Sequence, residues 1–137
     1  DAVGAYVAQE TVKKIVAQGG DISKGKVLVM GATFKENVAD IRNSKIIDIV
    51  KELTSFSVNV EVVDAYASSK EVQEEYGFSL VEEMGSDYDG IILAVAHDEY
   101  KNKPEEWFKQ KCKNNAFLLD LKGIYRGEIN ELDYWSL

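Results

Sequence analysis

The chain has 137 residues, of which 45% are hydrophobic and 29% are charged, and its net charge at neutral pH is −8. These values fit one globular domain with a core of useful size, and they exclude a disordered chain and a membrane-resident one. The acidic balance argues against a general nucleic-acid-binding surface, so an anionic ligand would need a local basic site.

The first part of the chain predicts a helix followed by a buried strand. Residues 2–17 repeat side chains at four-residue spacing, as a helix does, and Gly19-Gly20 ends the pattern. Residues 26–31 form a short apolar run of the kind that fills a buried parallel strand. We expect residues 1–19 to be the end of a central linker helix and residues 20–137 to be one Rossmann-like domain. The chain begins inside this helix without a methionine, and we interpret it as a piece of a longer protein.

Helices and strands alternate over the rest of the chain. Asn43 or Ser44 is a candidate cap for a second helix, whose apolar stripe runs from Ile46 to Leu53. The remaining expected elements are a strand at 58–63, a helix from Ser68 or Ser69 to about 76, a short strand at 78–81, a strand at 89–96, a helix at 104–111 and a strand at 116–120. This alternation predicts an α/β fold with a doubly wound, mainly parallel sheet, Rossmann-like and three-layered, preceded by an N-terminal helix.

The loop between the first strand and the second helix is the first candidate for function. In open α/β sheets, ligands bind beyond the carboxyl ends of the strands, near the reversal of strand order. A dinucleotide-binding fold would place Gly-x-Gly-x-x-Gly here, but this loop has only Gly31. It carries Lys35, a point charge suited to phosphate, and Arg42, a planar fork near the helix start. We therefore expect a sugar-nucleotide diphosphate more than NAD, although a solvated Lys35 and an Asp40–Arg42 pair that only holds the loop remain open.

A specific pattern lies in this region. Phe-Lys-x4-Asp-x-Arg-x-Ser is present at Phe34-Lys35, Asp40, Arg42 and Ser44. With it, the stretch from residue 27 to 50 resembles the start of the C-terminal, UDP-binding domain of the UDP-glucose/GDP-mannose dehydrogenase family. Further matches follow in the family's order at residues 63–65, 76–77, 94–100 and 120–123, so the resemblance covers essentially the whole chain. The last two matches look most like the branch that acts on UDP-N-acetylhexosamines.

The resemblance implies an activity and a division of labour. Members of the family oxidise the 6-hydroxyl of a nucleotide sugar to a carboxylate in two NAD-dependent steps, in the synthesis of surface polysaccharides. An N-terminal Rossmann domain holds NAD and a nucleophilic cysteine, and the C-terminal domain grips the nucleotide sugar. By this resemblance the chain binds a UDP-sugar, holds no NAD or metal itself, and is not catalytic alone. The full-length enzyme is expected to be a homo-oligomer with no nucleic-acid or membrane partner.

The same resemblance assigns expected roles to single residues. Phe34 and Lys35 line the nucleotide-sugar site, and Lys122 stands where relatives place a basic residue toward the substrate. The residues expected to shape the loop are Asp40, Arg42 and Ser44. Arg42 is also a secondary candidate for ligand contact.

Other residues have competing interpretations. Cys112 falls in a predicted helix among lysines that could lower its pKa. It lacks the family's glycine-rich nucleophile context, so an incidental thiol is favoured, and as the lone cysteine it suits a reducing cytoplasm. His97 could carry a proton, but a histidine that caps or packs a loop is favoured. Asp64, at a strand end, could be the acid that holds an NAD ribose, but this role is disfavoured because the glycine loop is missing. The aromatic tail, 134–137, is interpreted as core or interface packing.

Two other functions remain open at this point. The chain could be a degenerate Rossmann module that itself binds NAD. Alternatively, it could be an assembly domain whose long loop and aromatic tail make subunit contacts.

Overall fold

Five parallel strands form one sheet with the order β2-β1-β3-β4-β5. The computed structural model describes residues 2–137. The strands are β1 (Lys26–Met30), β2 (Asn59–Val63), β3 (Tyr88–Leu93), β4 (Cys112–Asp120) and β5 (Asp133–Ser136). The helices are α1 (Ala2–Ala17), α2 (Ile46–Ser55), α3 (Ser69–Tyr76) and α4 (Glu105–Lys109), with short 3-10 helices η1 (Ile22–Lys24) and η2 (Asp98–Tyr100). The predicted doubly wound, Rossmann-like α/β fold is confirmed.

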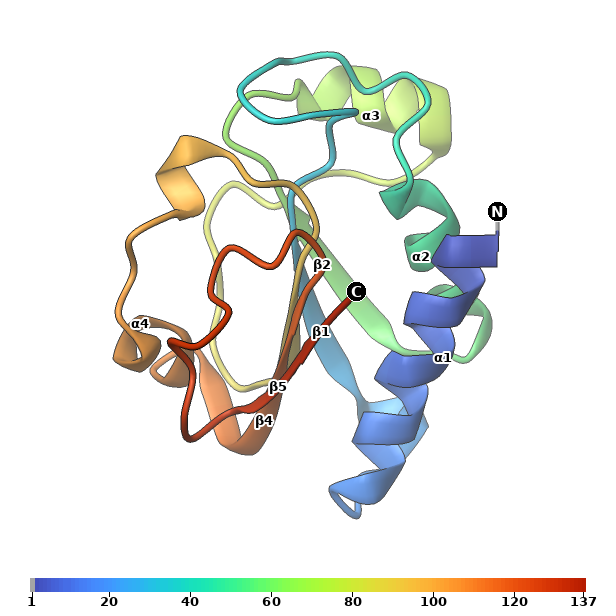
Figure 1. The fold of residues 1–137 in the computed structure, drawn as a ribbon. Helices are drawn as coiled ribbons and strands as arrows, with labels where there is room; N and C mark the ends of the chain where they lie inside the picture. Colours follow the sequence, from blue (N-terminus) through green and yellow to red (C-terminus); the bar gives the residue numbers. More distant parts are fainter. Residues whose placement is uncertain (1) are drawn as a thin grey trace.

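Alternate residues of the strands face two separate cores. In β1, Val27 and Val29 pack with α1 and α2 on one face of the sheet, whereas Leu28 and Met30 pack toward α4 on the other. Figure 1 shows α1 and α2 side by side along one face and α4 on the opposite side. The strand pattern, fully buried in β3, is that of a sheet covered on both faces. None of the helices within residues 2–137 has the length and apolar character needed to cross a bilayer.

The start of α2 differs from the prediction. The helix begins at Ile46 with Lys45 in the N-cap position, and no side chain caps it. The predicted cap by Asn43 or Ser44 is therefore wrong. Ser44 is buried, and its hydroxyl donates instead to the carbonyl of Thr33 at 3.5 Å. The residue thus connects the helix start to the loop that follows β1.

The C-terminal half contains three further differences. Cys112 is the first residue of β4 and does not lie in a helix, and burial raises the pKa of its thiol to about 12 rather than lowering it. Residues 78–81 form no strand, although the N–H of Val81 donates to the carbonyl of Val62 at 2.9 Å. The tail packs against the cores as predicted, but it does so as the edge strand β5, parallel to β4.

Gly31, at the end of β1, allows two strand ends to approach closely. Its φ is 109°, and a Cβ there would lie 2.6 Å from the Cβ of Val95, which follows β3. A side chain would therefore add both backbone strain and a clash with rigid atoms. This contact packs the end of β1 directly against the segment that follows β3.

We expect Gly31→Ala to lower the free energy of unfolding by about 3 kcal/mol or more, because strain and overpacking act together. Gly77→Ala is the matched control, since Gly77 also has a positive φ, 85°, but a Cβ there would meet nothing within 4 Å. Strain alone should cost the control about 1 kcal/mol. Urea denaturation measures both values, and equal losses would contradict the close approach to Val95.

Candidate functional site

The strand order reverses between β1 and β3. The chain leaves β1 toward α2 on one face and leaves β3 toward α4 on the other, so the two loops diverge at the carboxyl edge. A doubly wound sheet binds its ligand at such a point. Loops follow three neighbouring strands here: residues 31–45 (the β1 loop), residues 94–104 (the β3 loop) and residues 121–125 (the β4 turn). In Figure 1 the β1 loop lies at the top of the view, beside α3.

The β1 loop is tied back on itself by hydrogen bonds. The N–H of Phe34 donates to the carbonyl of Asp40 at 2.8 Å, and the hydroxyl of Thr33 donates to the carbonyl of Lys35 at 2.8 Å. The guanidinium of Arg42 donates to both carboxylate oxygens of Asp40 at 3.0 Å each. These bonds lower the pKa of Asp40 to about 2. The loop is long, but its backbone is fixed by its own polar groups.

His97, in the β3 loop, is buried beneath the β1 loop. Its side chain has no exposed surface. Its Nδ1 accepts the backbone N–H of Asn37 at 2.9 Å, so the ring proton lies on Nε2, which donates to Asp64 at 2.9 Å. Both nitrogens are therefore engaged within the protein. The interpretation of His97 as a loop-packing residue is confirmed.

Asp64, at the end of β2, is the acceptor at the centre of this edge. One carboxylate oxygen accepts the N–H of Ala32 at 2.6 Å as well as the His97 proton, and the other accepts the N–H groups of Tyr66 and Ala67 at 2.8 and 2.9 Å. Burial alone would raise the pKa of Asp64, but these donors together hold it below its ordinary value of 3.8. Its side chain is fully buried, so no carboxylate oxygen faces a ribose.

Phe34 and Lys35 project outward from the fixed loop. The ring of Phe34 is 56% exposed, and Lys35 is exposed as well. Within residues 2–137 the ammonium of Lys35 has no hydrogen bond or ion pair. An exposed aromatic side chain next in sequence to an unpaired cation could contact a partner that offers both a flat face and a negative charge.

Lys122 lies at the same edge, on the β4 turn. Asp120 ends β4 with a fully buried side chain that accepts the N–H groups of Ile124 and Tyr125 at 3.2 and 2.8 Å. Gly123 completes the turn with a φ of 69°. The Asp-x-Lys-Gly sequence is therefore a turn that presents an exposed lysine at the carboxyl edge.

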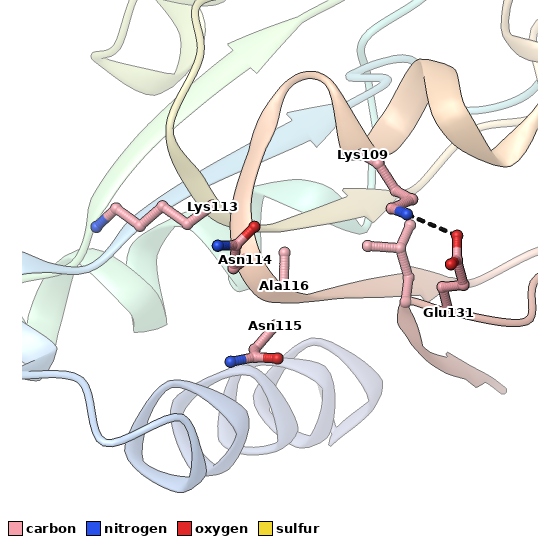
Figure 2. A pocket seen from close by; sticks show the side chains of 7 residues that line it. Lys109, Lys113, Asn114, Asn115, Ala116 and Glu131 are labelled. Atoms are coloured by element: carbon pink, nitrogen blue, oxygen red, sulfur yellow. Dashed lines mark hydrogen bonds and ion pairs between the residues drawn. The ribbon is translucent and has the colours of Figure 1, made fainter.

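Three surface pockets lie apart from these side chains. One, about 430 Å³, is at the amino edge, where the side chains of Lys109 and Glu131 pair at 2.6 Å (Figure 2). A second, about 300 Å³, is lined by Asp40 and Arg42 together with three glutamates of α3, which makes it acidic and unsuited to phosphate. A third, about 400 Å³, includes Glu82, Glu83 and Asp64. Phe34, Lys35 and Lys122 line none of the three and stand on open surface.

The described residues do not fit NAD or a metal ion. The β1 loop has no glycine beyond Gly31, and the oxygens of Asp64 are already hydrogen-bonded. Within residues 2–137, no group of three or more histidine, cysteine, aspartate or glutamate side chains is arranged to hold a metal.

Two residues that contact the segments around His97 and Asp64 belong to no motif in the sequence. Asn37 has a positive φ of 61°, and its side-chain oxygen accepts the N–H of Asp98 at 2.9 Å. The hydroxyl of Tyr66 donates to Glu99 at 2.8 Å. Asparagine tolerates left-handed backbone, so an asparagine within a loop was a weak signal. Nothing in the sequence pattern singled out Tyr66.

This fold and edge define a class of protein: a Rossmann-like α/β domain that presents cationic side chains, rather than glycine amides, at its switch point. Residues 28–127 match the model of the UDP-glucose/GDP-mannose dehydrogenase family, UDP binding domain. The chain belongs to this family, as the sequence resemblance predicted.

Relatives and solved structures agree with this assignment. The UDP-N-acetyl-D-glucosamine 6-dehydrogenases of Pseudomonas aeruginosa and Salmonella typhi are 42% and 38% identical over 133 residues, which is 96% of this chain and 32% and 31% of theirs. The UDP-N-acetyl-mannosamine dehydrogenase Cap5O from Staphylococcus aureus superimposes with a TM-score of 0.76 at 26% identity, over 97% of this chain and 29% of that one. UDP-D-ManNAc dehydrogenase from Pyrococcus horikoshii shares the fold, with a TM-score of 0.79 at 18% identity over 97% and 30% of the two chains. The chain thus spans about a third of the length of the relatives it matches.

We expect Asp64→Asn to lower the free energy of unfolding by about 3 kcal/mol near pH 7, because an amide cannot accept all four N–H donors. The folded pKa of Asp64 is below 3.8, so its stabilisation is complete above that value and is lost as the pH falls through the folded pKa. The difference in stability between the two proteins should therefore shrink in acid.

Urea denaturation at a series of pH values measures this difference. Asp87→Asn is the matched control, because Asp87 is exposed and its φ of 61° suits asparagine. The control should change stability by less than about 0.5 kcal/mol. A difference that stays constant well below the ordinary pKa would contradict a buried, ionised Asp64.

Proposed function

We propose that this chain binds the nucleoside diphosphate part of a nucleotide sugar, with a UDP-N-acetylhexosamine as the favoured ligand. The observation that carries the proposal is the exposed pair Phe34-Lys35, held on a loop whose backbone is fixed at the switch point of the sheet. The family assignment and the names of the relatives support the choice of ligand.

Each side chain has a chemical part in this proposal. The ammonium of Lys35 is a mobile point charge that can meet the diphosphate or the sugar oxygens. The ring of Phe34 offers an apolar face to the base or sugar. Lys122 adds a second cation from the neighbouring turn. Asp40, Arg42 and Ser44 are proposed to maintain the loop, with Arg42 as a secondary ligand contact.

The domain would act within a larger enzyme, an NAD-dependent 6-dehydrogenase that oxidises the sugar C6 hydroxyl to a carboxylate. Its contribution there is to position the substrate, because fixing the diphosphate also fixes the distance of C6 from the reacting groups. NAD and the cysteine nucleophile would be held outside this chain, and residues 1–19 would be the end of the helix that joins the parts. We place such an enzyme, as a homo-oligomer, in the cytoplasm and in surface polysaccharide synthesis.

In the enzyme that contains this domain, we expect Lys35→Ala to raise the KM for UDP-N-acetylglucosamine by about tenfold or more, which is the loss of one charge-assisted contact. The KM for NAD should remain unchanged. Lys24→Ala is the matched control, because it removes the same charge from the opposite edge of the sheet. Steady-state kinetics with each substrate varied in turn measures both constants, and an unchanged KM for the sugar would remove Lys35 from the site.

Calorimetry on the chain itself tests the choice of ligand. We expect heat on titration with UDP and none on titration with NAD. Heat with NAD alone would favour a cofactor-binding module instead. Absence of heat with both, together with a concentration-dependent mass in solution, would favour an assembly domain.

A further inference from the structure

His97 connects three loops that follow neighbouring strands. The ring comes from the β3 loop, donates to Asp64 at the end of β2, and accepts the N–H of Asn37 in the β1 loop. Its Nε2 also lies 3.3 Å from the hydroxyl of Thr33, at the start of the same loop. One buried side chain therefore contacts both sides of the segment that carries Phe34 and Lys35.

The ring is held in one orientation. Tyr66 packs against it at 4.7 Å between ring centroids and 52° between planes, and Tyr100 packs at 5.4 Å and 60°. The two nitrogens have different partners, an acceptor on one side and a donor on the other, so a flipped ring would lose both bonds. The position and direction of the Nδ1 lone pair are thereby fixed.

Burial of the His97–Asp64 pair carries a free-energy cost. Burying a charge and an imidazole costs desolvation that an apolar side chain of similar size would avoid. An apolar side chain, however, could not accept the N–H of Asn37 or direct it to one place. The pair therefore has an effect on loop geometry that simple filling of the core would not give.

The contact reaches the exposed side chains through few bonds. Asn37, with left-handed backbone, is fixed by His97 at its N–H and by Asp98 at its side-chain oxygen. Two residues earlier, the carbonyl of Lys35 is held by the hydroxyl of Thr33, which itself lies beside His97. The backbone between Lys35 and Asn37 therefore has little conformational freedom. The His97 ring determines the position of this segment.

We propose that His97, oriented by Asp64, is a positioning residue for nucleotide-sugar binding: it sets the conformation of residues 33–37 and so the place of Phe34 and Lys35. This inference rests on the proposed function of the site. His97 itself, being buried, makes no contact with the ligand.

Two substitutions separate the two bonds of the ring. In His97→Gln, the amide nitrogen can reach the position of Nε2 and donate to Asp64, but nothing accepts the N–H of Asn37. In His97→Asn, the amide oxygen can take the position of Nδ1 and accept that N–H, but Asp64 loses its donor. A merely structural role predicts that stability and substrate binding change together, whereas positioning predicts that they separate.

We expect His97→Gln to raise the KM for UDP-N-acetylglucosamine about tenfold in the enzyme that contains this domain, with kcat within about twofold and the KM for NAD unchanged. Amide hydrogen exchange at Asn37 should be at least about tenfold faster in this variant than in the wild type, while exchange in β1 and β3 stays the same. His97→Asn should lower the urea midpoint more than His97→Gln does, yet keep the KM and the Asn37 exchange near the wild-type values.

Nitrogen NMR of His97 in the wild-type chain provides a measurement that needs no variant, and it should show Nδ1 without a proton and Nε2 with one. A protonated Nδ1 overturns the proposal. So does a KM that is unchanged in His97→Gln, or one that rises in both variants in proportion to their loss of stability. If the wild-type enzyme shows no affinity for UDP-sugars, the proposed function has failed, and the positioning role fails with it. An enzyme that binds UDP-sugars while His97→Gln leaves KM unchanged instead isolates the failure to His97.

Discussion

The carboxyl edge of this sheet depends on one buried carboxylate. Asp64 accepts four hydrogen bonds, from the start of the β1 loop, from its own turn after β2 and from the β3 loop. A buried negative charge is tolerated only when its partners are complete, so each of these segments must be in place for the others to be stable. The β1 loop, the turn after β2 and the β3 loop therefore form one cooperative unit. The exposed side chains that these loops carry are ordered as a consequence.

The loop after β1 is held by hydrogen bonds of its own rather than built as a glycine-rich turn. Gly31 is the one glycine of the β1 loop, and it packs directly against Val95 in the β3 loop. The β1 loop is long and carries Lys35 on its exposed surface. In the proposed function, a lysine on this loop would meet the charged ligand in place of the phosphate cradle of a dinucleotide fold.

Much of this could be predicted from the sequence, and the misses have physical causes. Buried strands such as β1 and β3 show as apolar runs, and the stripe of α2 shows as helical periodicity, because their signals are local. The strand β5 has four residues and is only partly buried, so it lacks the apolar run that marks the buried strands. Cys112 lies between two lysines, and the first residues of β4 are partly or fully exposed. The sequence there has no apolar run that would mark the start of the strand. The family motif singles out Phe34 and Lys35 as site candidates, whereas the contacts of Asn37 and Tyr66 arise from tertiary structure that no spacing reveals.

The self-bonded β1 loop has a thermodynamic consequence for recognition. Its conformational entropy is lost when the chain folds, so little remains to be lost when a ligand arrives. Association should accordingly resemble the docking of a rigid template, with a fast on-rate set by diffusion and charge rather than by a slow rearrangement. With a net charge of −8, the domain as a whole would repel an anion, so an exposed lysine would attract it only over a short distance.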